Sequence, residues 1–254
     1  MDSMDTYWAD RAALEWLVEL GATEAMLDAP LNRYDVPEKI ATPAPLAAKG
    51  GPPPVPVQVE VDGAAEAKID AAGAADLDGL RAALMAFEHC DLKRGARNLV
   101  FAEGDPAARV MIIGEVPERD EDRAGKPFVG DVRILLDKMF AAIDLETASK
   151  VYMTSAFPWP AGLEPPTAKD IAMIKPFLER HIALANPDIV VLMGNTACQM
   201  LLGQGGLMRL RGTWAEVVGR PAIVLNHPMQ LLRNPSLKKD AWADLLALKA
   251  KLEG

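Results

Sequence analysis

Residues 109–140 read RVMIIGEVPERDEDRAGKPFVGDVRILLDKMF and carry the clearest indication of the fold class. This stretch starts with a short apolar strand at 109–115, continues through a polar loop and ends in a helix predicted at 132–143. A continuous apolar strand is buried on both faces, which is typical of a parallel sheet covered by helices. The stretch therefore indicates an α/β fold.

The same alternation of strand and helix continues toward the C-terminus. Further apolar strands are predicted at 151–157, 188–194 and 221–226. Helices are predicted at 76–90, 167–184, 195–203 and 236–252, with a Thr167–Asp170 capping box opening the second and Asn195 capping the third. We therefore predict a three-layer α/β/α fold with a central, mostly parallel four-stranded sheet.

Three parts are expected along the chain. Residues 1–40 are an acidic helical segment, with an amphipathic helix at 6–28. Residues 41–75 are rich in Pro, Ala and Gly and are interpreted as a semi-rigid linker. The PPPVP run at 52–56 is a spacer in the simplest interpretation and a ligand for a partner protein in the alternative. Residues 76–254 form the main domain.

Composition excludes several classes of protein. The chain has 254 residues, of which 50% are hydrophobic and 25% charged, a normal globular mix. It has no apolar run long enough to span a bilayer, and its N-terminus is acidic, so we expect a cytoplasmic protein without a membrane partner. The two cysteines, Cys90 and Cys198, form neither a disulfide framework nor a four-thiolate metal site.

The net charge of −9 is unevenly distributed. Residues 1–80 hold 15 acidic and 5 basic residues, whereas residues 81–254 hold 21 and 22. Residues 205–254 hold 4 acidic and 8 basic residues, so the C-terminal end is mildly basic. This pattern is compatible with contacts to phosphates, and equally with scattered solvated charge.

Ligands of parallel sheets bind at the carboxyl ends of the strands, and three unusual segments are expected there. They are GEVPERDEDRAGKPFVG at 114–130, TSAFPWPAG at 154–162 and NHPMQLLRNP at 226–235. The first matches neither G-x-G-x-x-G nor G-x-x-x-x-G-K-[ST], so no motif supports a nucleotide cofactor. Phe128 either offers a face on which a flat ring stacks or anchors its loop to the core.

His227 is the one histidine of three that is expected at the carboxyl end of a strand; His89 is expected at a helix end and His181 within a helix. Its imidazole can donate a hydrogen bond to a leaving group, act as a general base, or stabilise its loop. Arg233 can meet a phosphate, and Leu231 and Leu232 can supply an apolar wedge.

Taken together, these segments resemble the uracil-DNA glycosylase superfamily, most closely its family 4. The family's H-P-x-x-L-L-R is unbroken at 227–233, and RLRGTW at 209–214 is similar to the stretch before the final strand. The resemblance covers about residues 85–252. The family pattern G-E-x-P-G-x-x-E-D-x-x-G-x-P-F-V-G is followed at Gly114, Glu115, Pro117, Glu121, Asp122, Gly125, Pro127, Phe128, Val129 and Gly130.

The resemblance implies a DNA glycosylase domain at 76–254 that flips uracil, or a related deaminated base, out of DNA and hydrolyses its N-glycosidic bond in base-excision repair. It implies that Phe128 stacks on the base and that His227 hydrogen-bonds the developing uracil anion. It also places Glu115 and Glu121 near the sugar and the attacking water. Base contact is implied for Gly114 and Ser155, and DNA contact for Pro117, Leu231, Leu232 and Arg233. We expect a monomer.

Two departures from the family pattern bear on activity. Ser155 stands where the family has the Asn that reads the uracil edge, and a rotating hydroxyl replaces a fixed donor and acceptor. The loss is worth about 1–3 kcal/mol. Glu118 stands where the family has a glycine that lets DNA approach. We expect specificity to be relaxed, moved to another base, or lost.

Family 4 members usually hold a [4Fe–4S] cluster on four cysteines. Only Cys90 matches, because the other three positions are Lys93, Trp159 and Ile174. One thiolate cannot hold a cluster, so we predict that the protein has no iron–sulfur cofactor and no other metal. Packing of the large apolar side chains of Trp159 and Ile174 is expected to provide the stabilisation that the cluster gives in other members.

Two other functions remain as alternatives. A non-catalytic or weakly active paralogue would bind damaged or single-stranded DNA through Phe128 and the His227 loop. An unrelated α/β enzyme acting on a small molecule has no supporting cofactor motif. The N-terminal helix can dock on the main domain, recruit a protein partner or shield the basic face.

Overall fold

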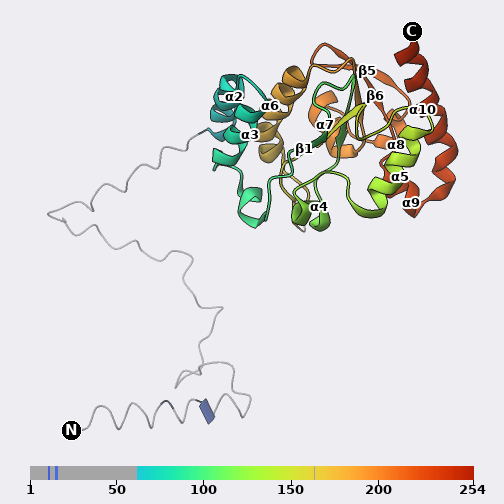
Figure 1. Ribbon diagram of the computed structural model, residues 1–254. Coiled ribbons are helices and arrows are strands. Elements are labelled where there is room, and N and C mark those ends of the chain that lie inside the picture. The colour runs from blue at the N-terminus through green and yellow to red at the C-terminus, as the bar shows by residue number, and fades with distance from the viewer. Residues whose placement is uncertain (1–10, 12–14, 17–61, 163) are drawn as a thin grey trace, which may run out of the picture. The chain divides into compact units, whose positions relative to one another are not determined.

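A computed structural model describes Arg11, Glu15 and Trp16, residues 62–162 and residues 164–254 (Figure 1). The chain divides into two units, Met1–Gln58 and Val59–Gly254. In the first unit Arg11 and Glu15 form an ion pair of 3.0 Å at the i, i+4 spacing of a helix. The rest of the expected helix at 6–28, the segment 1–40 and the PPPVP run lie outside the described residues.

The second unit is built on a mixed sheet of six strands in the order β1-β3-β2-β4-β6-β5. The four inner strands are parallel, and they are the four that the apolar runs predict. The two edge strands run antiparallel to their neighbours. The prediction of a four-stranded sheet is therefore wrong in strand number. The strands are β1 Ala102–Gly104, β2 Val110–Gly114, β3 Val151–Ser155, β4 Ile189–Leu192, β5 Trp214–Val217 and β6 Arg220–Val224.

Local reasons explain why the edge strands escaped prediction. β1 has only three residues, Ala-Glu-Gly, and none is a typical strand former. β5 and β6 form a hairpin around Val218 and Gly219, whose φ angles are 50° and 71°. Two consecutive positive φ angles match a type I′ turn, and valine is not a residue that signals such a turn.

Helices cover both faces of the sheet (Figure 1). One buried cluster joins strand residues such as Ile113 to α2, α3, α6 and α7, and a second joins Ile112 to α5 and α10. Successive strand residues thus face opposite clusters, which confirms the three-layer arrangement. The helices are α2 Gly63–Gly73, α3 Leu77–Ala86, α4 Arg119–Ala124, α5 Gly130–Ala141, α6 Ala168–Ala185, α7 Asn195–Leu202, α8 Leu207–Leu210, α9 Pro228–Arg233 and α10 Lys238–Glu253, with 3-10 turns at Asp91–Gly95 and Pro235–Leu237.

The predicted helix caps are right for α6 and wrong for α7. Thr167 and Asp170 form the expected capping box at the start of α6. The N-cap of α7 is Gly194, and the side chain of Asn195 instead accepts a hydrogen bond of 2.6 Å from the amide of Gly206. The free amide of Thr196 donates to Glu115, a residue that lies far away in sequence.

The linker expected over 41–75 is wrong in its last part, because α2 lies there. Asp62 caps this helix by accepting from the amide of Ala64 at 3.1 Å. Ala67 and Ala71 are buried, and α2 packs along α6. Small residues at i, i+4 spacing let two helices approach closely, so a composition typical of a linker here serves helix packing.

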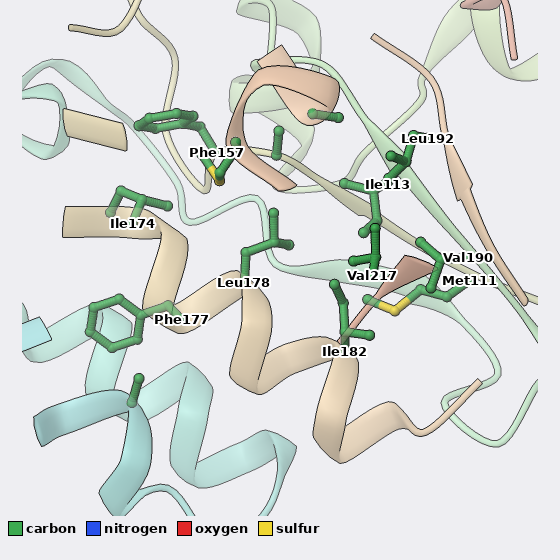
Figure 2. Packing of buried hydrophobic residues seen from close by; sticks show 14 of the residues in the cluster. Met111, Ile113, Phe157, Ile174, Phe177, Leu178, Ile182, Val190, Leu192 and Val217 are labelled. Carbon is green, nitrogen blue, oxygen red and sulfur yellow. The ribbon is translucent and has the colours of Figure 1, made fainter. Parts of the chain in front are cut away.

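The core on the α6 side is continuous with the sheet. Figure 2 shows Ile174, Leu178 and Ile182 of α6 in the same cluster as the strand residues Met111 and Ile113. Within the described part of the chain, no helix has the length and apolar character that crossing a membrane requires.

Candidate active site

A cavity of about 410 Å³ opens at the carboxyl ends of the parallel strands. Each inner strand contributes a residue at or just beyond its end: Ser155 from β3, Gly114 from β2, Gly194 from β4 and His227 from β6. This is the edge at which ligands of parallel sheets bind. Eight of the ten residues singled out from the sequence line the cavity, namely Gly114, Glu115, Glu121, Phe128, Ser155, His227, Leu232 and Arg233.

The phenyl ring of Phe128 packs on the end of β2. A Cβ atom added to Gly114 would stand 2.7 Å from Cζ of Phe128, so only glycine allows this approach. Phe128 has a φ of 54°, a left-handed conformation that is unfavourable for a large side chain. Its side chain is only 2% exposed, so the ring forms an inner wall of the cavity.

Glu121 holds this strained loop. One carboxylate oxygen accepts from the amide of Phe128 at 2.6 Å, and the other accepts from the amide of Glu118 at 2.8 Å. The second bond belongs to a capping box at the start of α4, a helix within the segment expected to be a loop. Burial raises the pKa of Glu121 above its ordinary value.

Glu115 is engaged in a similar way. Its two carboxylate oxygens lie 3.0 and 3.2 Å from the amide nitrogen of Thr196, at the first turn of α7. A carboxylate is favoured at this end of a helix because the unpaired amides carry partial positive charge. Glu115 thus ties the end of β2 to the end of β4, where Gly194 leaves room for its side chain.

His227 is the N-cap of α9, and its Nδ1 accepts from the amide of Met229 at 3.2 Å. Burial lowers the pKa of His227 to about 4. The imidazole is therefore neutral at pH 7, and because Nδ1 accepts, the proton resides on Nε2. The ring is stacked on Phe128 with 5.5 Å between ring centres.

The end of β3 presents one free hydroxyl to the cavity. Thr154 is not available, because its hydroxyl donates to the carbonyl of Phe101 at 2.6 Å. Ser155 is 6% exposed, and its hydroxyl has no hydrogen bond within the described residues. A hydroxyl in this position can donate to or accept from a ligand.

Of the four residues expected to contact DNA, two are exposed and two are buried. Leu232 is 40% exposed and Arg233 is also exposed, and both line the mouth of the cavity. Leu231 is 1% exposed and packs inside. Pro117 is buried and lines a neighbouring groove instead of the cavity.

Sequence reasoning missed Gly194 and Gln230, which also line the cavity. Gly194 is the last residue of the strand predicted at 188–194 and lies two residues beyond the end of β4, and its φ of 151° suits only glycine. A glycine at the end of an apolar strand was the available signal. Gln230 occupies a variable position of the H-P-x-x-L-L-R pattern, and nothing in its own sequence marks it.

The residues at the expected cluster positions do not fit an iron–sulfur cluster. The Lys93 ammonium donates to the carbonyls of Met85 at 2.6 Å and Phe87 at 3.0 Å. Trp159 and Ile174 are each 2% exposed within the apolar core. Cys90 is buried, which raises the pKa of its thiol. Among the residues that the structure describes, no three His, Cys, Asp or Glu side chains are grouped to hold a metal ion.

This fold and cavity correspond to a known class. Residues 101–246 match the family model of the uracil DNA glycosylase superfamily, and the chain belongs to that superfamily.

Within the superfamily, the chain is similar to proteins named type-4 uracil-DNA glycosylase. The one from Archaeoglobus fulgidus is 30% identical over 178 residues, which are 66% of this chain and 89% of the relative. The one from Thermotoga maritima is 30% identical over 151 residues, 58% of this chain and 78% of the relative. A DNA polymerase of Bacillus phage SP01 is 28% identical over 153 residues, 60% of this chain but 17% of the polymerase.

Proposed function

We propose that this protein is a DNA glycosylase that removes uracil from DNA as the first step of base-excision repair. Its membership of the superfamily and the names of its relatives support this function. The observation that carries the proposal is the pairing of Phe128 with a neutral His227 in one cavity. An enclosed aromatic wall suits a flipped base, and an imidazole N–H suits the charge that the base develops as it leaves.

The reaction hydrolyses the bond between the sugar C1′ and N1 of uracil. The electron pair of that bond moves to the base, which leaves as an anion, while the sugar becomes cationic. Nε2–H of His227 donates a hydrogen bond to the carbonyl oxygen on which the negative charge collects. A water molecule then bonds to C1′ and gives up a proton, which the uracil anion takes up, so the products are an abasic site and neutral uracil.

A neutral His227 suits this step better than a charged one. Protonation of Nδ1 would break its hydrogen bond with the Met229 amide, and burial opposes the charged form. A neutral donor stabilises the developing anion without being repelled by the cationic sugar. We assign His227 the role of hydrogen-bond donor to the leaving group.

Glu115 and Glu121 hold the main chain around the cavity in place. Because their oxygens accept from main-chain amides, we assign both as positioning residues. Glu121 holds Phe128, and Glu115 holds the strand ends that border the cavity. Glu118, Asp120 and Asp131 are exposed on the cavity rim, where their negative charge favours a cationic sugar.

The protein is further proposed to work without an iron–sulfur cluster. The hydrogen bonds of Lys93 to the carbonyls of Met85 and Phe87 and the packing of Trp159 and Ile174 support this proposal. They leave Cys90 as a single thiol, which donates to the carboxylate of Asp170 at 4.0 Å. Stoichiometric iron with absorbance near 400 nm in anaerobically purified protein would contradict it.

Contact with the DNA strand is assigned to Leu232 and Arg233, which stand exposed at the cavity mouth. The cytoplasmic location, the monomeric state and the roles of residues 1–40 and of the PPPVP run stay predictions. The division between linker and glycosylase domain is now proposed near residue 62, where α2 begins.

The test is a glycosylase assay on single- and double-stranded oligonucleotides that carry uracil, hypoxanthine or xanthine. Alkali then breaks the strand at abasic sites. Cleavage at uracil is expected, with strong losses in His227→Ala and Phe128→Ala. Cleavage only at another base would move the specificity. Intact DNA binding without any cleavage would favour a non-catalytic paralogue.

A further inference from the structure

Gln230 is a polar residue of the cavity to which the mechanism gives no role. It is the third residue of α9 and lines the cavity together with Ser155 and His227. Its main chain is fixed, because its amide donates to the carbonyl of His227 at 2.9 Å and its carbonyl accepts from the amide of Asn234 at 2.8 Å. Its position beside the imidazole is therefore well defined.

The side chain of Gln230 is not committed in the same way. Its Oε1 is buried and has no hydrogen-bond partner within the described residues. A buried acceptor without a partner is costly, and native proteins rarely leave one unless a water or ligand satisfies it. The terminal torsion of glutamine is soft, so this amide can turn toward a ligand in the cavity.

The other enclosed polar groups of the cavity are already occupied. Glu115 and Glu121 accept from main-chain amides, and Nδ1 of His227 accepts from Met229. The remaining polar residues that line the cavity, Glu118, Asp120, Asp131 and Arg233, are exposed. Within the described residues, three enclosed side-chain groups are left for a base: Nε2–H of His227, the hydroxyl of Ser155 and the amide of Gln230.

The chemistry of uracil distinguishes these three groups. With His227 on the carbonyl that gathers charge, the opposite edge of uracil presents a ring N–H donor beside a carbonyl acceptor. The single hydroxyl of Ser155 can satisfy one of them at a time. A carboxamide offers an acceptor and a donor at a fixed spacing, which matches both.

We propose that Gln230 reads the hydrogen-bonding edge of the flipped base, beside Ser155, and thereby determines base specificity. This inference rests on the proposed function and names the residue that makes it selective for uracil. The amide that a serine at position 155 cannot supply comes, in this chain, from the helix that follows His227.

The test compares Gln230→Met, which keeps the length of the side chain, and Gln230→Glu, which keeps only acceptors. Gln199→Met, on the exposed side of α7, is the matched control. Single-turnover excision is measured on single-stranded oligonucleotides that carry uracil or cytosine at one position. Thermal unfolding is recorded for every protein, and Gln230→Leu repeats the test if methionine lowers the unfolding temperature.

The expected result for Gln230→Met is a roughly 10- to 100-fold slower excision of uracil and a smaller preference for uracil over cytosine. Gln230→Glu should reduce that preference further, since a carboxylate accepts from the amino group of cytosine and repels a carbonyl. The control should behave as the wild type. A Gln230→Met protein that keeps the uracil rate and the preference within about twofold would overturn the inference.

Binding of free uracil separates this inference from the proposed function. If the wild-type protein excises no base, the proposed function fails, and NMR titration with uracil still tests Gln230. Clearly weaker binding by Gln230→Met than by the wild type would support the inference in that case, and equal affinity would overturn it.

Discussion

Removing the carboxylate of Glu121 should release Phe128. In Glu121→Ala, the amide of Phe128 loses a 2.6 Å hydrogen bond at a position that is 2% exposed, so no water replaces it fully. The amide of Glu118 lies at an exposed residue and can turn to solvent. A bond to a charged acceptor is worth about 1.5–3 kcal/mol, and we expect the free energy of unfolding to fall by that amount.

The effect on excision should exceed the effect on stability. Holding Phe128 at a φ of 54° costs on the order of 1–3 kcal/mol, and without Glu121 the loop relaxes away from that conformation. A displaced aromatic wall no longer positions the base, and such a displacement slows a reaction up to roughly 100-fold. Glu121→Gln keeps one acceptor and should fall between alanine and the wild type in both properties.

Three measurements distinguish a positioning role of Glu121 from a direct role of its carboxylate in the reaction. They are the single-turnover rate, the unfolding temperature and hydrogen exchange of the Phe128 amide. Glu179→Ala, a surface change on α6, is the control. If Glu121 positions Phe128, hydrogen exchange of the Phe128 amide should become faster as the excision rate falls. If Glu121→Ala abolishes excision while exchange and stability stay as in the wild type, the carboxylate acts directly on the substrate or water and is not a positioning residue.

Three further predictions concern stability. Lys93→Met should lower the free energy of unfolding by about 1–3 kcal/mol, because it removes the ammonium that binds the carbonyls of Met85 and Phe87 at the C-terminal end of α3. An unchanged denaturant unfolding curve would show that these hydrogen bonds do not stabilise the fold. Burial lowers the pKa of His181 to about 3, so the unfolded chain takes up a proton below pH 6.5 that the folded chain does not. The free energy of unfolding should therefore decrease as the pH is lowered, with a contribution of about 2–3 kcal/mol from this residue between pH 6.5 and 4.5. In His181→Phe the free energy of unfolding should depend less steeply on pH. An unchanged dependence would show that His181 is not buried as a neutral group. Asn226 is fully buried, and neither atom of its amide has a partner among the described residues, so Asn226→Leu should not lower the free energy of unfolding; a loss above about 1 kcal/mol would reveal a hidden partner.

The inner sheet was predictable because each of its strands is a continuous apolar run. Ile112 and Ile113 face opposite layers of the core, and such strands need no alternation to be recognised. The edge strands and α2 were not predictable by the same signal. Ala-Glu-Gly has no strand preference, and the Ala- and Gly-rich sequence of α2 becomes a helix through its packing on α6.

Most residues of the site could be predicted from the sequence, but the hydrogen bonds that hold them in place could not. The motifs brought Phe128 and His227 to one edge of the sheet. The partner of Glu115 is the first turn of α7, about eighty residues later, and no local pattern indicates that contact. Asn195 was predicted as the N-cap of α7 because no local pattern shows that its side chain accepts from the distant amide of Gly206. Gln230 belongs to the site only because the orientation of α9 places this residue at the cavity.

In the proposed mechanism, a neutral His227 stacked on Phe128 drives the release of uracil. The most direct test is mass-spectrometric detection of free uracil after a single turnover with a uracil-containing single strand, for the wild type and His227→Ala. We expect stoichiometric uracil from the wild type and a large loss in the variant. Because His227 is neutral over this range, the wild-type rate should not fall between pH 8 and pH 6 through protonation of this residue. Equal release by both proteins would show that His227 does not assist the departure of uracil, and no uracil from the wild type would show that the protein is not a uracil-DNA glycosylase.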